Sequence, residues 1–269
     1  MEGKTLQTIA LAIAIPTLSQ GALVSHYNLD DTSSGVAVDS VSGNNAIWQN
    51  GTNTNLSNSA GQIGGAASLS DGGGAGANNF FQMSLPELVG VNGISISLWI
   101  NNQSQSSNGY NGIFMTRTFN GATNNSWGLA IENNGDERLD SRVNGPGIDS
   151  ANGLLAPNGN WKHLAMVWDG DTATHTQYIN GVQTATGDSI SGPTVGPDSG
   201  PWFIGYDSCC GNSRDFDGAI DDIMVWNNAL SAGQIDSIYQ AGLLGASVPE
   251  PNTSLLGILG GMLLLRRRR

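Results

Sequence analysis

Short segments of alternating apolar and polar residues, separated by clusters of Gly, Asn and Ser, fill most of this chain. Glycine occupies 38 of the 269 positions and asparagine 28, and both residue types favour turns and are poor inside helices. Charged residues make up only 12% of the chain. These features exclude a helical bundle or a coiled coil, and they predict an all-β protein with many polar loops.

The clearest expected strand is Ile94–Ile100, in which every second residue is Ile or Leu. Other segments of this kind are Leu23–Leu29, Gly112–Arg117, Trp127–Ile131, Trp161–Trp168, Gln177–Ile179, Trp202–Tyr206 and Ala219–Trp226. The pair Asn180-Gly181 predicts a hairpin, because a type I′ turn needs positive φ at both central residues. About ten to twelve strands with no helical pattern between them indicate one domain, a two-sheet antiparallel sandwich.

One short helix is expected near the end of this domain. Ser231 and Gln234 have the spacing of a capping box, and Ile235, Ile238 and Tyr239 form an apolar stripe. We expect this helix to plug one end of the sandwich.

The first 21 residues are typical of a secretory signal peptide. Lys4 precedes the apolar run Ile9–Ile15, Pro16 interrupts it, and the small residues Ser19 and Gly21 have the spacing of a cleavage site. The alternative is a buried first strand, which an Ala-rich run followed by Pro suits poorly. The sequence therefore predicts an exported protein.

Residues 247–269 form a second addressing segment. A Pro-Glu-Pro motif precedes the apolar run Leu255–Leu265 and a basic tail; these motif and tail residues are Pro249, Glu250, Pro251, Arg266, Arg267, Arg268 and Arg269. This order resembles the bacterial PEP-CTERM sorting signal, which implies processing by an exosortase-type membrane enzyme. The apolar run is shorter than the roughly 20 residues that span a bilayer, so we expect a transient membrane anchor rather than a permanent one.

The segment between Leu23 and Ser247 is strongly acidic. It contains five basic residues (Arg117, Arg138, Arg142, Lys162 and Arg214) against twenty acidic ones, a net charge of −15. Such a surface repels phosphate backbones, so nucleic acid is excluded as a partner. It suits divalent cations, or simply solubility outside the cell.

Three segments give the domain a family resemblance. They are Ile96-Ser-Leu-Trp-Ile100, Trp161–Asp169 with Tyr178-Ile-Asn-Gly181, and Phe216–Trp226 with Ala229-Leu-Ser231. Together with the early turn Asp39–Asn44, they resemble the laminin-G-like, concanavalin-A-like jelly rolls of secreted bacterial proteins. The resemblance implies a jelly roll over residues 22–246, flanked by the signal and sorting helices. It also implies a carbohydrate or protein ligand and a structural calcium ion.

The expected calcium ligands are three aspartates. Strand alternation predicts that Asp221 shares a face with Ile223 and Val225, and a charge in that position needs a partner. The position of Asp221 is similar to that of a calcium-binding Asp in related glucanases, and the resemblance implies Asp30 and Asp39 as its companions. The alternative is that Asp221 pairs with backbone amides.

The expected ligand-binding residues lie on a polar loop and beside it. Adjacent Cys209 and Cys210 can close a disulfide that, with Tyr206 and Arg214, would stack on a sugar ring. Asp207 and Asn212 would add hydrogen bonds, whereas the alternative is a stapled loop without a ligand. Trp127 follows the expected loop at 123–126, so we expect it to be an exposed sugar platform.

Catalysis is not expected. Glycoside hydrolysis needs two suitably spaced carboxylates. Glu132, Asp136 and Glu137 instead flank Asn133-Asn134-Gly135, which is typical of a turn, so we expect them to be solvated loop carboxylates. The histidines His26 and His163 lie within strands, and no Gly-x-Ser-x-Gly elbow occurs. The sequence therefore predicts a non-catalytic binding or adhesion module for a polysaccharide or matrix protein, delivered to the cell envelope or extracellular matrix. The alternatives are a secreted glycan-processing enzyme and a structural matrix protein without a ligand.

Overall fold

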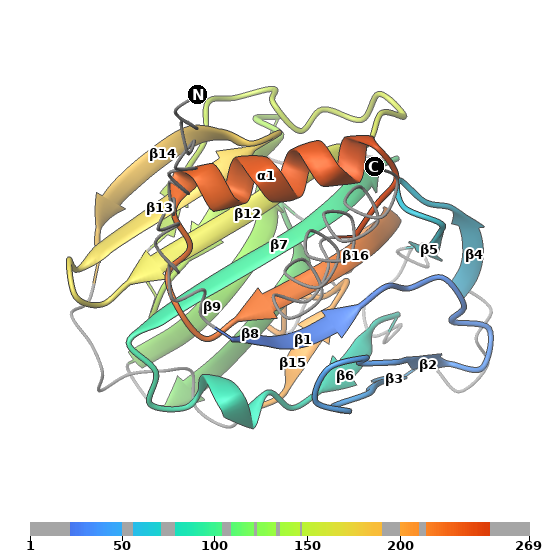
Figure 1. The fold of residues 1–269 in the computed structure, drawn as a ribbon, viewed down its shortest axis with the longest axis horizontal. Helices are drawn as coiled ribbons and strands as arrows, with labels where there is room; N and C mark the ends of the chain where they lie inside the picture. Colours follow the sequence, from blue (N-terminus) through green and yellow to red (C-terminus); the bar gives the residue numbers. More distant parts are fainter. Residues whose placement is uncertain are drawn as a thin grey trace, which may run out of the picture.

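Two antiparallel sheets of eight strands each pack face to face in the computed structural model (Figure 1). The structure describes residues 22–49, 56–70, 79–103, 109–120, 123–132, 135–145, 147–189, 200–209 and 214–247; the side chains of 118–120 and 123–124 are not among them. The expected signal peptide at 1–21 and the residues of the sorting motif, 249–269, lie outside the described residues. The all-β sandwich expected from the sequence is confirmed.

The first sheet, sheet A, has the strand order β14-β13-β12-β7-β16-β5-β4, and β1 also pairs with β16. Its strands are β1 (Leu23–Tyr27), β4 (Leu56–Ala60), β5 (Gly65–Leu69), β7 (Gly93–Asn102), β12 (Lys162–Asp169), β13 (Thr174–Ile179), β14 (Val182–Asp188) and β16 (Gly218–Trp226). The β13–β14 hairpin turns at Asn180 and Gly181, whose φ angles of 53° and 74° confirm the expected turn.

The second sheet, sheet B, has the order β11-β10-β9-β8-β15-β6-β3-β2. Its strands are β2 (Val36–Ala37), β3 (Ala46–Trp48), β6 (Phe81–Met83), β8 (Tyr110–Asn120), β9 (Thr123–Glu132), β10 (Arg138–Arg142), β11 (Gly147–Asp149) and β15 (Trp202–Ile204). A single 3-10 turn, η1 (Pro86–Leu88), precedes β7. The described residues thus hold sixteen strands, more than expected, because several strands of two to five residues are too short to show alternation.

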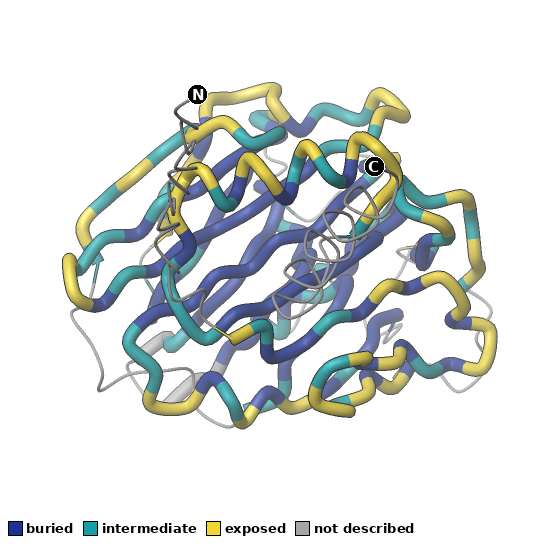
Figure 2. Tube along the Cα trace, in the orientation of Figure 1, coloured by how far each residue is buried: buried dark blue, intermediate teal, exposed yellow. Residues whose placement is uncertain are grey.

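The main core lies between the two sheets. Ile94, Ile96, Leu98 and Ile100 of β7 all enter it, as the alternation predicted. Figure 2 shows the central strands buried and the exposed positions gathered on loops and edge strands. The sandwich therefore has two outer faces, one for each sheet, on which function can be placed.

Helix α1 (Ala232–Leu243) covers the outer face of sheet A (Figure 1). Ser231 caps it through the expected box, since Gln234 N donates to its hydroxyl (3.3 Å) and Ser231 N donates to Gln234 Oε1 (2.8 Å). Ile235 and Ile238 pack in a second apolar cluster with residues of β12, β13 and β16. The helix therefore lies across a sheet face and does not plug an end, so that prediction was wrong.

A bulge in β16 changes which face its residues occupy. The strand register shifts between Asp221 and Met224, and Asp222 has a φ of 49°. Because of the extra residue, Asp221 is cross-strand from Trp99 on the outer side, whereas Ile223 and Val225 enter the main core. The prediction that Asp221 shares a face with Ile223 and Val225 was wrong, since simple alternation does not anticipate a bulge.

Candidate functional site

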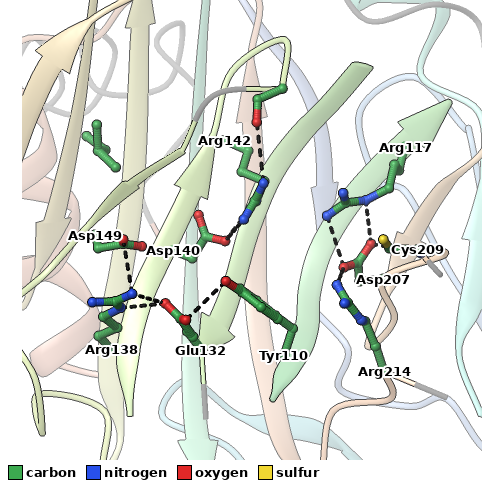
Figure 3. Close-up of polar contacts among 12 residues, drawn as sticks. Tyr110, Arg117, Glu132, Arg138, Asp140, Arg142, Asp149, Asp207, Cys209 and Arg214 are labelled. Carbon is green, nitrogen blue, oxygen red and sulfur yellow. Dashed lines mark hydrogen bonds and ion pairs between the residues drawn. The ribbon is translucent and has the colours of Figure 1, made fainter. Parts of the chain in front are cut away.

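A cluster of charged residues and one tyrosine occupies the outer face of sheet B, and we refer to it as the polar cluster (Figure 3). Its members are Tyr110, Arg117, Glu132, Arg138, Asp140, Arg142, Asp149, Asp207 and Arg214. Strand register sets this arrangement, because Tyr110, Glu132 and Arg138 are cross-strand neighbours on β8, β9 and β10. Four of the five basic residues in the described part of this acidic chain lie here.

One part of the polar cluster centres on Glu132. Tyr110 Oη donates a hydrogen bond to Glu132 Oε1 (3.0 Å), and Arg138 Nε donates to Glu132 Oε2 (2.5 Å). Arg138 also approaches Asp149 at 3.4 Å. Burial and the hydrogen bond to Glu132 raise the pKa of Tyr110. Glu132 is the last residue of β9 and is buried, so the prediction that it is a solvated loop carboxylate was wrong.

The next part is the pair of Asp140 and Arg142. Arg142 Nε and Nη2 both donate to Asp140 Oδ2, at 2.7 and 2.5 Å, while Asp140 Oδ1 is buried with no partner among the described residues. Burial raises the pKa of Asp140 to about 6, against the lowering effect of Arg142. Gly147 leaves room for this carboxylate, since a Cβ there would lie 2.5 Å from Asp140 Oδ1.

The third part is a single carboxylate between two guanidinium groups. Asp207 Oδ1 accepts from Arg117 Nε (2.7 Å), and Asp207 Oδ2 accepts from Arg117 Nη2 (3.0 Å) and Arg214 Nη1 (2.8 Å). The Cys209 amide donates to Oδ1 at 3.1 Å. Asp207 is fully buried, and burial lowers the pKa of Arg117 while Asp207 raises it. Asp207 therefore holds the two arginines, and its full burial contradicts the prediction that it offers hydrogen bonds to a sugar.

Tyr110 contacts all three parts of the polar cluster, since it also lies close to Arg142 and Arg214. The guanidinium of Arg214 lies 4.8 Å from the centre of its ring, and that of Arg142 lies 5.7 Å away. Arg214 Nε is buried with no hydrogen-bond partner among the described residues. Buried polar atoms are rarely left unpaired, so Arg214 Nε and Asp140 Oδ1 mark a donor and an acceptor that a ligand could satisfy.

Of the remaining residues of the predicted sugar platform, Tyr206 and Cys209 lie in the described part of the chain. Tyr206 stacks on Phe80 at 4.4 Å and contacts Phe203 edge-on at 5.5 Å, so one face of its ring is covered. Cys209 is buried and disulfide-bonded. Cys210 and Asn212 lie outside the described residues.

Trp127 is buried in the main core, so the prediction that it is exposed was wrong. Strand β9 begins at Thr123, which makes the expected loop at 123–126 part of the sheet. Trp127 faces inward, 5.1 Å from the ring of Trp168, and its Nε1 donates to Asn125 Oδ1 (2.7 Å).

Two of the three aspartates expected to hold calcium lie against the turn at residues 61–65. Asp221 Oδ2 accepts from Ile63 N (2.8 Å), and Asp30 Oδ1 accepts from Gly65 N (2.5 Å). Asp221 Oδ1 is buried without a partner among the described residues, and burial raises the pKa of Asp221 to about 7. A Cβ on Gly61 would lie 2.6 Å from Asp221 Oδ2 and 2.3 Å from the Gly65 carbonyl oxygen. This carboxylate and carbonyl suit the oxygen preference of calcium.

Asp39 does not fit the proposed metal set. Its carboxylate accepts from His26 N (3.0 Å), Val41 N (3.0 Å), Ser42 Oγ (2.8 Å) and Asn44 N (3.1 Å). Burial alone would raise the pKa of Asp39, but these hydrogen bonds lower it. Asp39 therefore stabilises the turn that follows it, and each of its carboxylate oxygens already accepts two hydrogen bonds.

Of the polar-cluster residues, Asp207 and Arg214 were predicted from the sequence as ligand-binding residues, and the others were not. One signal was available: Arg138, Asp140 and Arg142 alternate along five residues, which places them on one strand face. Tyr110, whose ring lies near Arg142, is far away in the sequence, so only the strand register brings the group together.

The polar cluster offers planar donors and acceptors but no loosely held carboxylate pair. Glu132 is bonded to Tyr110 and Arg138, and Asp140 is bonded twice by Arg142. Within the described residues, no group of three or more His, Cys, Asp or Glu side chains is placed to hold a metal.

The part of the chain that the structure describes contains no helix long and apolar enough to cross a membrane.

Comparisons with solved structures show the same fold. Domain 4 of AbnA, a GH43 extracellular arabinanase from Geobacillus stearothermophilus solved with arabinotriose, has 22% identity and a TM-score of 0.58; the match covers 81% of this chain and 98% of that domain. Trypanosoma rangeli sialidase in complex with sialic acid has 12% identity and a TM-score of 0.62, over 84% of this chain and 34% of the sialidase. The binding domain of Paraclostridial Mosquitocidal Protein 1 has 14% identity and a TM-score of 0.58, over 81% and 52%.

A search of curated protein sequences finds no match to this chain. A family model does match, over residues 71–236, and it describes the concanavalin A-like lectin/glucanases superfamily. The matched range contains most strands of both sheets and all of the polar cluster. With the two-sheet sandwich, this places the chain in the concanavalin A-like lectin/glucanases superfamily.

Proposed function

We propose that this protein is an exported, non-catalytic carbohydrate-binding or adhesion module and that the polar cluster is its ligand site. The observation that carries the proposal is the placement of four of the five described basic residues on one sheet face of a strongly acidic domain. Each is held by a carboxylate, so the donors are fixed in direction before a ligand arrives.

A carbohydrate suits the chemistry of this face. Sugar hydroxyls both donate and accept, and the polar cluster leaves one buried donor, Arg214 Nε, and one buried acceptor, Asp140 Oδ1, without partners among the described residues. Its outer members, Arg138 and Asp149, are partly exposed. The similarity to a domain solved with arabinotriose supports a polysaccharide as the ligand class.

The experiment is a glycan array probed with the purified protein and two charge-matched variants. Arg138→Gln removes a cation from the polar cluster, and Lys162→Gln removes the one described cation outside it. We expect glycan binding by the wild type and by Lys162→Gln, and loss of binding by Arg138→Gln. Equal loss in both variants, or no bound glycan, would contradict the proposal.

A glycan-processing enzyme is the second candidate, because of Asp140. A carboxyl group with a pKa of about 6 has the property of a general acid, and Glu132 lies on the neighbouring strand. The paired state of both carboxylates favours binding over turnover. Reducing-sugar release from plant or algal polysaccharides that disappears in Asp140→Asn would establish the enzyme.

We also propose a structural calcium ion beside the 61–65 turn, with Asp30 and Asp221 as its carboxylate ligands. Calcium would supply positive charge to the buried carboxylate of Asp221, whose Oδ1 has no partner among the described residues. We expect calcium to raise the melting temperature of the wild type but not that of Asp221→Asn. An equal rise in both, or none in the wild type, would rule out this site.

Delivery to the cell envelope or extracellular matrix forms part of the proposal. It rests on the signal-peptide pattern at the start of the sequence and on the Pro249-Glu-Pro251 motif with its basic tail. The processing partner would be an exosortase-type membrane enzyme, with membrane association lasting only until cleavage. Cell fractionation should place the wild type outside the cytoplasm, and replacement of Pro249-Glu-Pro251 by alanines should hold the protein at the membrane.

A further inference from the structure

A small polar pocket of about 320 Å³ lies at the edge of sheet A where β7 begins and β12 and β16 end. It belongs to a different sheet from the polar cluster. Five of its seven lining residues are Asn or Asp: Asn92, Asp169, Asp171, Asn227 and Asn228. None of the basic residues of the described part of the chain lines it.

The walls of the pocket are held by short contacts. The hydroxyl of Ser95 donates to the Asn228 carbonyl (2.8 Å) and accepts from Leu230 N (2.9 Å). The carbonyl of Asn92 accepts from Gly170 N (3.0 Å). A Cβ on Gly93 would lie 2.6 Å from Ala229 N, so the start of β7 packs tightly against this segment. The pocket is therefore formed before any ligand binds.

The hydrogen bonds of the pocket leave two acceptors unpaired and use one donor of each of two asparagines. Asn92 Nδ2 donates to Asp171 Oδ1, and Asn228 Nδ2 donates to the Ala229 carbonyl (3.2 Å). The amide oxygens of Asn92 and Asn228 are buried and have no partner in the described part of the chain. Leaving such acceptors unpaired costs free energy, which a hydroxyl donor would recover.

A metal ion does not suit this lining. Both oxygens of Asp169 are already used, because they accept from Asp171 N (2.9 Å), Thr172 N (3.4 Å) and Thr172 Oγ1 (2.8 Å). Asp171 is then the one remaining carboxylate of the lining, fewer than calcium sites generally use.

The geometry points to a ligand with several hydroxyl groups, and we infer that this pocket binds one polyhydroxylated ring, such as the end residue of a glycan. Its volume equals that of about ten water molecules, which is enough for a single ring. Ring hydroxyls would donate to Asp171 and to the amide oxygens of Asn92 and Asn228. The side chain of Asn227 makes no hydrogen bond within the described residues and would donate to the ring. This site is independent of the polar cluster.

The test is a titration of the isotope-labelled full chain with methyl glycosides of common hexoses and pentoses, followed by NMR. The signals of interest are the side-chain amide groups of Asn92, Asn227 and Asn228. We expect at least one glycoside to shift these signals, and Asp171→Asn to weaken its binding roughly tenfold, the effect of losing one charged hydrogen bond. Asp236→Asn on the exposed surface of α1 makes the same chemical change elsewhere and should leave binding unaltered.

A second variant, Asn227→Ala, distinguishes loss of the ligand contact from loss of the fold. The Asn227 side chain makes no hydrogen bond in the described structure, so its removal should not affect folding. This variant should melt like the wild type and bind the same glycoside more weakly. The inference is overturned if no glycoside shifts the three amide groups, if the shifts appear only at the polar cluster, or if both pocket variants bind as the wild type does. The proposed function would stand in each of these cases, since it is tested by Arg138→Gln.

Discussion

The two outer faces of the sandwich are built in opposite ways. On sheet A, helix α1 buries Ile235 and Ile238 against the strands, and Tyr239 stacks on Trp99 at 5.7 Å. On sheet B, the corresponding outer surface carries the polar cluster, in which ion pairs replace apolar contacts. The face of sheet A under α1 is therefore closed to a large ligand, whereas the face of sheet B offers directed donors and acceptors.

The contacts that stabilise the domain and the proposed ligand site therefore lie on different faces. Burying apolar side chains under a helix is favourable in itself, whereas a buried ion pair often contributes little net stability. The fully buried Asp207 and its two arginines are thus a costly way to cover a sheet. We propose that its role is to hold the two arginines of the ligand site in position.

The largest expected effect comes from breaking the network at its centre. Asp207→Ala leaves Arg117, whose side chain is 3% exposed, without the carboxylate that now receives two of its hydrogen bonds. We expect a loss of about 3–5 kcal/mol in the free energy of unfolding, measured by urea denaturation. Asp149→Asn, at a carboxylate 40% exposed in the same cluster, should cost at most about 1 kcal/mol. Similar losses in the two variants would contradict this account.

A cavity between α1 and sheet A should lower the free energy of unfolding without changing glycan affinity. Ile235→Ala removes a fully buried side chain between α1 and sheet A and should cost about 2–5 kcal/mol. Glycan affinity at the polar cluster should stay at the wild-type value, because α1 lies on the other sheet. A loss of affinity in the folded variant would show that the two faces are not separate.

The buried carboxylate beside the 61–65 turn should make stability depend on pH. The pKa of Asp221 is about 7 in the folded chain and near 3.8 when unfolded, so its ionisation destabilises the fold increasingly as pH rises from about 4 to 7. In the presence of a chelator, Asp221→Asn should be more stable than the wild type by about 2 kcal/mol at pH 8, and this difference should vanish near pH 4. A constant difference across this range would contradict the assignment.

The smallest effect is expected at the start of α1. Ser231→Ala removes the acceptor of the capping box and should cost about 1 kcal/mol. Ser231→Asp keeps an acceptor at the same position and should retain most of the stability. Thermal unfolding of the three proteins checks this, and equal losses in the Ala and Asp variants would show that the side-chain acceptor at this position is not what stabilises the helix.

The fold could be predicted from the sequence because its signals are local. The alternation in Ile94–Ile100, the Asn180-Gly181 turn and the Ser231 capping box each lie within a few residues, and all three are present in the structure. The position of α1 could not be predicted in the same way, because it depends on which sheet face is apolar after all strands have paired.

The candidate site could be predicted only in part. Asp207 and Arg214 lie close together in the sequence, but Tyr110 and Arg138 join them only through strand pairing. A single bulge in β16 reversed the expected face of Asp221, and an unexpected strand start at Thr123 buried Trp127. Long-range register and local irregularity are the two kinds of information that composition and alternation do not contain.

Amide chemical-shift mapping during titration with a glycan selected on the array tests whether the polar cluster is the ligand site. We expect shifts concentrated on the outer-face residues of β8, β9 and β10 and at Arg214, with the strands under α1 unchanged. Shifts confined to sheet A, with Tyr110, Arg138 and Arg142 unaffected, would contradict the assignment of the ligand site to the polar cluster.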